Sequence, residues 1–246
     1  MTPTFEESVK RALFRTGFGV APVNECGVLL FDSAAWLPSA SAAHGYLDAR
    51  EGLRANRFRF ERDRTTYVLA HACWRIALGV SLGMETAQVP LLIAASGQPT
   101  LPGTGMATSL SHSGSWVAIA IGNVVTIGVD IESTPTRGAL ATLVNELCTP
   151  AEKTYLETLP PSGHEDAMLA LWTRKEALLK AFGIGLLAEP SSVQADPDAV
   201  VSPPPSAPMQ VPCQVRNICL PDNLAGALAR PAGTAGRCGL YSLPCS

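Results

Sequence analysis

Residues 128–132 read Gly-Val-Asp-Ile-Glu, and residues 171–180 read Leu-Trp-Thr-Arg-Lys-Glu-Ala-Leu-Leu-Lys. The first stretch predicts a strand, whose period of two places Asp130 and Glu132 on one face and the apolar residues on the other. The second stretch predicts a helix that carries a third carboxylate, Glu176. Carboxylates from a strand and from a helix can together make an all-oxygen site for a hard divalent cation such as Mg²⁺.

Composition limits the class of protein. The chain has 246 residues, of which 47% are hydrophobic and 16% charged, so it can bury a core and is globular rather than disordered. The net charge of −3 argues against a surface-wide field that attracts nucleic acid or an anionic membrane. Its 7 cysteines are scattered without a CxxC motif, which favours reduced thiols in a cytoplasmic protein over a disulfide framework or a zinc site. A signal-peptide pattern and a long apolar run are both missing, so we expect neither secretion nor a membrane span.

The first half of the chain predicts alternating strands and helices. Short apolar runs bounded by turn residues predict strands at 26–31, 89–94, 116–121 and 124–132. A helical pattern covers 67–82, and Gly97-Gln98-Pro99 is a turn signal. Another short strand is expected to end at Leu110, which leaves His112 in a turn, and Gly122-Asn123 predicts a two-residue hairpin.

The second half predicts helices. Thr149-Pro150-Ala151-Glu152 has the pattern of a capping box, with proline at the first helical position. Residues 162–165 suggest another capping box, which opens a helix that runs to Phe182 and ends at Gly183. The proline-rich stretch 201–208 predicts a surface loop, and the Gly/Ala/Pro-rich tail after it predicts no element.

A faint internal repeat relates the two halves. Gly27-Val28 recurs as Gly128-Val129, and five residues of the first predicted helix region recur 100 positions later: Leu69, Ala70, Ala77, Leu78 and Gly83. A duplication of this kind predicts an α/β (α+β) fold of two similar halves that pack together. We expect the halves to be residues 1–122 and 123–246, with one active site at their junction.

Each of these signals also has a plainer interpretation. The strand carboxylates can be the solvent face of an edge strand, Glu176 and Lys180 can be a surface i, i+4 pair, and His112 can be a solvated turn residue. The five arginines between residues 54 and 64 can be a solvated helix start as well as an anion site. Joint occurrence in one order along one chain favours the functional interpretation.

This ordered set of motifs resembles the 4′-phosphopantetheinyl transferase superfamily, in particular its larger, surfactin-synthetase-activator (Sfp) type. Residues 128–132 match the strand motif Gly-(Val/Ile)-Asp-(Val/Ile)-Glu, and residues 172–180 match the helix motif Trp-x-x-Lys-Glu-(Ala/Ser)-x-x-Lys. Ser111-His112-Ser113 resembles the family's Ser-His-Ser element, and Gly97-Gln98-Pro99 its Gly-Lys-Pro element, with Gln98 where lysine is usual. The resemblance covers roughly residues 54–186, and it implies that the two α/β halves are related by pseudo-twofold symmetry.

The resemblance implies a Mg²⁺-dependent enzyme with two partners, coenzyme A and an apo acyl or peptidyl carrier protein. The 4′-phosphopantetheine arm of coenzyme A would move to a serine of the carrier, with release of adenosine 3′,5′-bisphosphate. The implied metal ligands are Asp130, Glu132 and Glu176, and the implied catalytic residues are Glu176, Lys180 and His112. Glu176 would take the proton of the serine hydroxyl, either directly or through a metal-bound water. These residues suit the cleavage of a pyrophosphate. Negative charge develops as the pyrophosphate bond breaks, and a bound cation and the Lys180 ammonium would stabilise that charge.

The resemblance also implies a set of contacts to coenzyme A. These are Arg57, Arg64, Gln98, Pro99, Ser111, His112, Lys175 and Lys180. His112 would meet the 3′-phosphate. Gln98 can form hydrogen bonds but brings no charge, so we expect either a weaker hold on the coenzyme or a different pose of it. We expect a cytoplasmic monomer with no nucleic-acid or membrane partner.

Two questions stay open at the level of sequence. The first is the carrier, because fatty-acid, polyketide and peptide synthesis all present a similar serine, and tolerance for acyl-coenzyme A is equally undecided. The second is the class of function. The alternatives are a coenzyme A or carrier-binding protein of the same fold that has lost turnover, and an α/β interaction protein whose motif matches are accidental.

Overall fold

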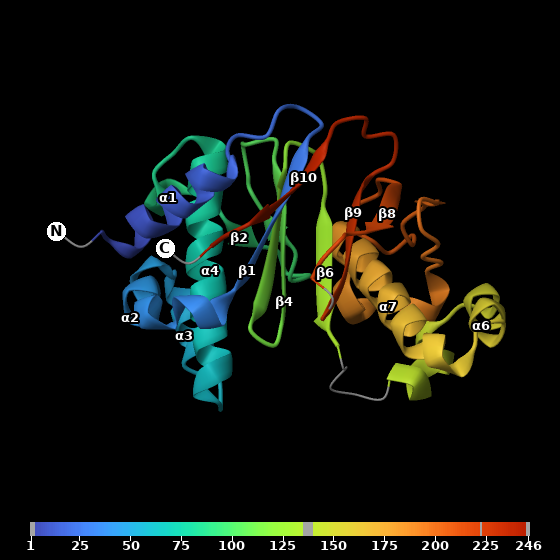
Figure 1. Ribbon diagram of the computed structural model, residues 1–246. Coiled ribbons are helices and arrows are strands. Elements are labelled where there is room, and N and C mark those ends of the chain that lie inside the picture. The colour runs from blue at the N-terminus through green and yellow to red at the C-terminus, as the bar shows by residue number, and fades with distance from the viewer. Residues whose placement is uncertain (1–2, 135–139, 222, 245–246) are drawn as a thin grey trace.

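The computed structural model describes residues 3–134, 140–221 and 223–244. It has a mixed α/β architecture, in which helices pack on two four-stranded sheets (Figure 1). This confirms the predicted fold class. Among the described residues, no helix combines the length and the apolar character needed to cross a bilayer.

The first sheet has the strand order β10-β1-β5-β4. Its strands are β1 (Cys26–Asp32), β4 (Ala107–Ser113), β5 (Trp116–Gly122) and β10 (Cys238–Ser242). β10 runs parallel to β1, and the other neighbours are antiparallel. A strand from the very end of the described chain therefore completes the sheet that the first strand begins.

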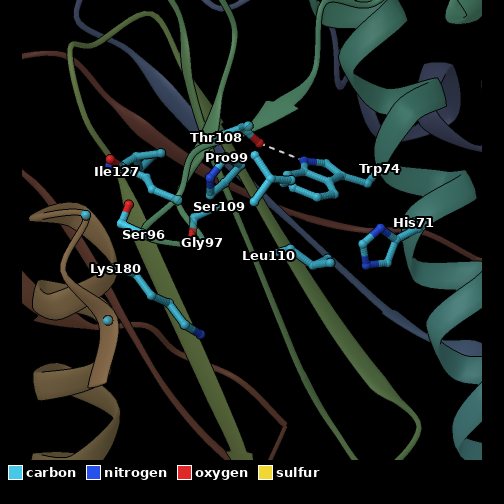
Figure 2. Close-up of a pocket in the computed structure, with 14 residues that line it drawn as sticks. His71, Trp74, Ser96, Gly97, Pro99, Thr108, Ser109, Leu110, Ile127 and Lys180 are labelled. Atoms are coloured by element: carbon cyan, nitrogen blue, oxygen red, sulfur yellow. Dashed lines mark hydrogen bonds between the residues drawn. The ribbon is translucent and has the colours of Figure 1, made fainter. Parts of the chain in front are cut away.

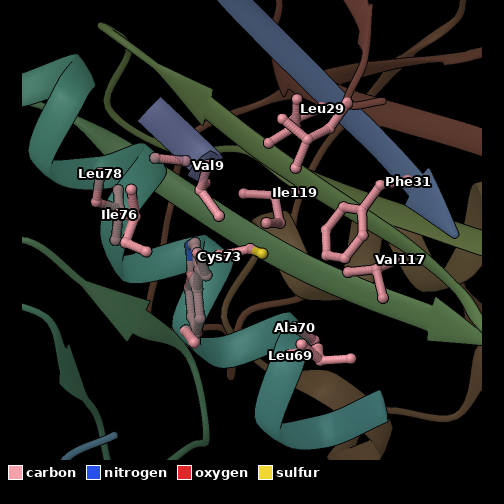
Figure 3. Packing of buried hydrophobic residues seen from close by; sticks show 14 of the residues in the cluster. Val9, Leu29, Phe31, Leu69, Ala70, Cys73, Ile76, Leu78, Val117 and Ile119 are labelled. Carbon is pink, nitrogen blue, oxygen red and sulfur yellow. The ribbon is translucent and has the colours of Figure 1, made fainter. Parts of the chain in front are cut away.

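Helix α4 (Glu61–Leu82) covers one face of this sheet. Its buried side chains, among them Leu69, Cys73 and Ile76, pack against Leu29 and Ile119 of the sheet (Figure 3). The helix ends at Gly83, which adopts a left-handed conformation with φ 64° that glycine enters without steric cost. The other elements of this half are α1 (Phe5–Thr16), α2 (Ala40–Ala43), α3 (Ala49–Ala55), β2 (Leu92–Ile93) and β3 (Pro99–Thr100).

The second sheet is antiparallel and has the order β6-β9-β8-β7. Its strands are β6 (Gly128–Ser133), β7 (Val200–Val201), β8 (Cys213–Asn217) and β9 (Leu224–Pro231). Helix α7 (His164–Ala181) packs on β6, β9 and β8, and two shorter helices, α5 (Val144–Leu147) and α6 (Pro150–Glu157), precede it. Gly128 permits the close packing of α7 on β6, since a Cβ at this position would lie 2.0 Å from the carbonyl oxygen of Ala177.

The two sheets meet where β4 lies beside β6 (Figure 1). Val129 and Ile131 of β6 pack into one apolar cluster with Val28 and Leu30 of β1. Asp130 and Glu132 point to the other face of β6, as the period of two predicts. A shared core thus joins the halves at the place where the strand motif lies.

Several local predictions were wrong. Residues 122–123 do not form a hairpin, because β5 belongs to the first sheet and β6 pairs with β9 in the second. The tight hairpin lies instead at Gly114-Ser115, between β4 and β5, so His112 is a strand residue rather than a turn residue. Helix α7 begins without a side-chain cap, whereas the predicted capping box of Thr149 and Glu152 is present.

The faint repeat falls on corresponding elements. Gly27-Val28 lies in β1 and Gly128-Val129 in β6, and the repeated helical residues lie in α4 and α7. However, β1 is an interior strand of its sheet, whereas β6 is the edge strand of its own. The pseudo-twofold relation and the division at residues 122 and 123 therefore stay predictions.

Candidate functional site

The side chains of Asp130 on β6 and Lys180 on α7 form an ion pair. The Lys180 Nζ atom lies 2.7 Å from Asp130 Oδ1 and 3.1 Å from the carbonyl oxygen of Val129. Asp130 is almost completely buried, whereas the Lys180 side chain is 27% exposed. The structure thus brings together a strand residue and a helix residue that are 50 positions apart in the chain.

Glu176 lies one turn before Lys180, near the same carboxylate. Burial raises the pKa of Glu176 to about 7, and the negative charges of Asp130 and Glu132 add to this rise, whereas Lys180 opposes it. The mutual influence of these charges places the three predicted acids in one neighbourhood. Glu132 is half-buried on β6, and its Oε2 atom accepts a hydrogen bond of 2.7 Å from Ser113.

Two buried carboxylate oxygens in this neighbourhood, Asp130 Oδ2 and Glu176 Oε1, have no hydrogen-bond partner among the described residues. A buried oxygen without a partner is costly unless a ligand or water satisfies it. The described side chains form no preformed group of three or more His, Cys, Asp or Glu with metal-ligand geometry. The donor set nevertheless fits a hard cation, because its free atoms are carboxylate oxygens.

Two adjoining cavities lie next to these residues, between α4, the β2–β3 hairpin, β4 and the end of α7. The smaller one, of about 260 Å³, is lined by Trp74, Gln98, Pro99 and Lys180, among others (Figure 2). The larger one has a volume of about 800 Å³. His71, Gly97 and Leu110 line both cavities, so the two adjoin and are together called the cleft.

The larger cavity gathers positive charge. Its lining includes Arg50, Arg54, Arg57 and the strand residue His112. The cavity withdraws His112 from part of the solvent and so lowers its pKa, and the positive charges of Lys180 and His71 lower it further. Arg57 and His112, which the resemblance implies as contacts to coenzyme A, thus line one cavity. Arg50 and Arg54 line the same cavity, although the resemblance did not imply them as contacts.

Gln98 and Pro99 lie at the smaller cavity, as part of the hairpin that joins β2 to β3. Gly97 takes a φ of 87° in the turn. The Gln98 side chain rests against Gly183 at the end of α7, where a Cβ would come within 2.2 Å of its Oε1 atom. This contact ties the hairpin of the first half to the helix of the second.

Arg64 lies elsewhere. It lines a different pocket with Glu61, Thr65 and His44, and its guanidinium is 2.9 Å from the Glu61 carboxylate. It follows Glu61 by three residues on α4, so the pair is a local surface ion pair. The structure does not bring Arg64 to the cleft that Arg57 and His112 line.

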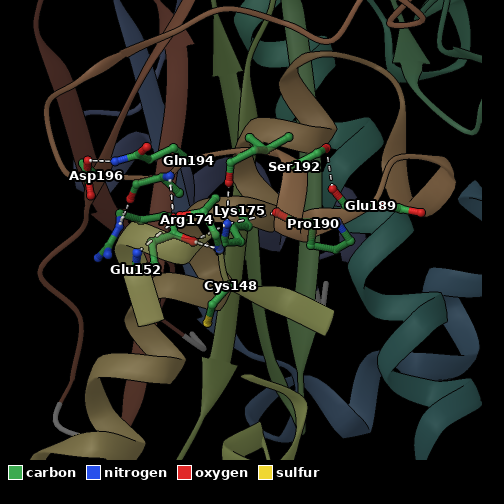
Figure 4. Close-up of polar contacts among 12 residues, drawn as sticks. Cys148, Glu152, Arg174, Lys175, Glu189, Pro190, Ser192, Gln194 and Asp196 are labelled. Carbon is green, nitrogen blue, oxygen red and sulfur yellow. Dashed lines mark hydrogen bonds and ion pairs between the residues drawn. The ribbon is translucent and has the colours of Figure 1, made fainter. Parts of the chain in front are cut away.

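Lys175 corrects a sequence prediction. Its side chain is fully buried inside the second half, and its ammonium lies 2.7 Å from Glu152 and 2.9 Å from the carbonyl oxygen of Pro190 (Figure 4). The carbonyl oxygen of Val193 accepts a third bond. Since an ammonium has three protons, these acceptors use all of them. Lys175 is therefore a core residue here and not a contact to coenzyme A.

The cleft also contains a buried polar network that sequence reasoning missed. Glu51 accepts a hydrogen bond from Arg75 Nε at 2.7 Å and lies 2.9 Å from His71 Nδ1, and Arg75 also reaches Asp48 at 2.7 Å. These partners lower the pKa of Glu51 to about 2, although burial alone would raise it. Two features of the sequence could have revealed this network: the capping box Asp48-x-x-Glu51, and the i, i+4 spacing that places His71 and Arg75 on one face of a helix.

Comparisons with known proteins agree on one family. Residues 126–227 match the family model described as the 4′-phosphopantetheinyl transferase superfamily. The chain is 33% identical over 144 residues to the 4′-phosphopantetheinyl transferase HetI of Nostoc sp., and 26% identical over 141 residues to a 4′-phosphopantetheinyl transferase of Bacillus subtilis. It is also 25% identical over 190 residues to the mouse L-aminoadipate-semialdehyde dehydrogenase-phosphopantetheinyl transferase.

These matches are partial on both sides. The matched stretches cover 57%, 57% and 72% of this chain, in the same order. They cover 61%, 62% and 60% of the relatives, so the chain spans about three fifths of the length of each. The family model begins just before β6 and ends within β9, and it includes Asp130, Glu176 and Lys180.

Proposed function

We propose that this chain transfers the 4′-phosphopantetheine arm of coenzyme A to a serine of an apo carrier protein, on the premise that its residues 126–227 match the 4′-phosphopantetheinyl transferase superfamily. The observation that carries the proposal is the convergence of Asp130, Glu176 and Lys180 beside a cleft lined with arginines. The two carboxylates leave buried oxygens for a cation, and the lysine and arginines supply charge for phosphates.

Coenzyme A fits the cleft by charge and by size. We assign the 3′-phosphate end of the molecule to Arg57 and His112, which line the larger cavity. We assign the diphosphate, where the reaction would take place, to Lys180, which lines the smaller cavity. A cleft of this extent is of the size that encloses a cofactor-sized ligand.

Transfer requires one bond to form and one to break. The serine oxygen of the carrier attacks the phosphorus that bears the pantetheine arm. The bond between that phosphorus and the bridging diphosphate oxygen breaks, and adenosine 3′,5′-bisphosphate leaves. Glu176 accepts the proton of the serine hydroxyl, and Lys180 stabilises the charge that develops on the phosphoryl oxygens.

Asp130, Glu132 and Glu176 would hold Mg²⁺, which, when bound, neutralises charge on the diphosphate. Asp130 Oδ2 and Glu176 Oε1 are the atoms in need of a partner. Lys180 occupies the other oxygen of Asp130, which leaves Oδ2 for the cation. The chain's own part is thus to hold these oxygens away from bulk water.

Mass spectrometry of a carrier protein tests the proposal. The protein is mixed with coenzyme A, Mg²⁺ and an apo carrier, and we expect the carrier to gain the mass of one phosphopantetheine arm. An unchanged carrier, together with tight coenzyme A binding by calorimetry, would instead identify a binding protein that has lost turnover. The Lys180→Met variant serves as the control, because it removes the ammonium and retains a side chain of similar length.

We further propose that the protein is of the larger Sfp type, cytoplasmic and monomeric. The monomer is supported by the site itself, since β4, β6 and α7 of one chain supply its residues. The free thiols of the described cysteines support a reducing compartment. Sedimentation with and without coenzyme A tests the monomer.

A further inference from the structure

Three serines on β4 form a row that joins the two sheets. The row consists of Ser109, Ser111 and Ser113, whose side chains point to one side because they alternate along the strand. Each hydroxyl oxygen accepts a backbone N–H of β6, from Val129 at 3.1 Å, Ile131 at 3.3 Å and Ser133 at 3.0 Å. Side chains thus take the place of the backbone ladder that would otherwise pair two neighbouring strands.

Two members of the serine row make a further bond that the third does not. The Ser111 hydroxyl donates to Asp130 Oδ1 and the Ser113 hydroxyl to Glu132 Oε2, each at 2.7 Å. A hydroxyl has one proton, so each of these serines directs its proton at one carboxylate. Within the described part of the chain, Ser109 makes its backbone bond without a bond to any carboxylate.

These bonds limit the orientations of the two carboxylates. With Oδ1 of Asp130 held by Ser111 and Lys180, its Oδ2 atom is the one left buried and unpaired. Glu132 has more rotatable bonds than aspartate, and its hydrogen bond to Ser113 restricts them. Both serines are themselves buried, so water does not compete freely for the hydroxyls.

We propose that Ser111 and Ser113 are positioning residues that orient Asp130 and Glu132 toward the divalent cation. Ser109, which lines the smaller cavity, ties the sheets together without a bond to either carboxylate and so is the comparison residue for metal binding. This positioning role rests on the proposed function, because the cation is part of it. Partners that orient metal ligands typically contribute about 10–100-fold to metal affinity. The serine row would therefore have two separable effects, one on stability and one on metal binding.

The test compares Ser109→Ala, Ser111→Ala and Ser113→Ala in the full chain with coenzyme A bound. Mn²⁺ binding is measured by electron paramagnetic resonance, and thermal stability by calorimetry. We expect all three variants to lose stability. Ser111→Ala and Ser113→Ala should lose more than Ser109→Ala, because each loses a bond to a carboxylate of β6 as well as a backbone bond between the sheets. The Kd for Mn²⁺ should rise about 10–100-fold for Ser111→Ala and Ser113→Ala and stay within about twofold for Ser109→Ala.

A second pair of variants guards against misfolding. Ser113→Thr retains the hydroxyl and Ser113→Val replaces it with a methyl group in a side chain of the same shape. We expect the threonine variant to bind Mn²⁺ more tightly than the valine variant by about tenfold. Equal affinities in this pair, or an equal loss in Ser109→Ala, would overturn the proposal.

Failure of this inference can be told apart from failure of the proposed function. If wild type modifies the carrier but all serine variants bind Mn²⁺ like wild type, the positioning role is wrong and the transferase stands. If the carrier is never modified while Ser111→Ala and Ser113→Ala weaken Mn²⁺ binding, the positioning role stands and the proposed transferase activity is wrong. A wild-type protein that binds no Mn²⁺ with coenzyme A present overturns the positioning role.

Discussion

At the scale of single residues, Glu176 combines burial with neighbouring negative charge. Both causes make its ionised form unfavourable in the folded protein, and its pKa rises to about 7 from the ordinary value of 4.5. The folded state therefore binds this proton more tightly than the unfolded state. Stability contributed by the protonated carboxyl is complete below about pH 4.5 and is lost as the pH rises to about 7.

The Glu176→Gln variant should therefore be more stable than wild type at pH 8 in the presence of a chelator. The upper bound is about 3–4 kcal/mol, at about 1.4 kcal/mol for each unit of pKa, and the gain at pH 5 should be about a quarter as large. Urea unfolding at the two pH values measures it. The exposed Glu157→Gln variant on α6 serves as the control, and a gain of equal size at both pH values would contradict the assignment.

Gln98 is the residue at which this chain departs from the family pattern. It lines the same cavity as Lys180, so a lysine at this position adds charge near the phosphates. We expect Gln98→Lys to leave kcat similar and to lower KM for coenzyme A about fivefold, which corresponds to ~1 kcal/mol for a partly solvated ion pair. Steady-state kinetics checks this against Gln88→Lys, the same change on an exposed turn outside the cavity. An increase in KM would count against the placement.

At the scale of elements, the position of α7 depends on the buried pair of Lys175 and Glu152. Glu152 caps α6 through the N–H of Thr149 at 2.7 Å and also accepts the N–H of Ala195 at 2.9 Å. Together with Lys175, these bonds connect α6, α7 and the segment that follows α7. A motif lysine thus holds the helix that carries Glu176 and Lys180.

Lys175→Met should destabilise the protein by about 3–5 kcal/mol, because it leaves the Glu152 carboxylate buried without its charged partner. Chemical denaturation measures the loss. Lys153→Met on α6, whose ammonium is exposed, should change stability by less than about 0.5 kcal/mol. If Lys175→Met instead raised KM for coenzyme A at unchanged stability, the cofactor role would be restored.

At the scale of the whole molecule, the two sheets share one apolar cluster and one row of hydrogen bonds. Cys26, Val28 and Ala118 of the first sheet pack with Val129 and Ile131 of the second. β10 then returns from the second half to pair with β1, and the backbone N–H of Leu243 binds the carbonyl of Leu30 at 2.8 Å. Neither half can lose its structure without exposing part of the core of the other.

We therefore expect the whole chain to unfold in urea in one cooperative transition. Tryptophan fluorescence, which includes Trp36 and Trp74 of the first half, should give the same midpoint as backbone circular dichroism. Leu243→Asp, which places a charge in the buried contact of the C-terminal segment, should shift both midpoints together. Two separate transitions would mean that the halves are independent domains.

Sequence reasoning succeeded where the pattern is local. The strand period at Asp130 and Glu132, the capping box at Thr149 and the helix that ends near Gly183 all follow from neighbouring residues, and the structure confirms them. It failed at β8, β9 and β10. β9 is rich in Ala and Gly, which have little strand preference, and β8 and β10 are only 5 residues long each. Such strands form because a neighbouring edge offers hydrogen bonds.

The sequence by itself determined which residues we propose for the chemistry: the acids of the strand and helix motifs, the lysine one turn after Glu176, and the Ser-His-Ser element. Only the tertiary structure decided the partner of each one. In the folded chain Lys175 lies in the core, Arg64 lies outside the cleft, and the Ser111 hydroxyl donates a hydrogen bond to Asp130. The physical reason is that hydrogen bonds and ion pairs depend on distance in space. The alignment of β4 with β6 sets these distances, and it cannot be deduced from the sequence of either strand alone.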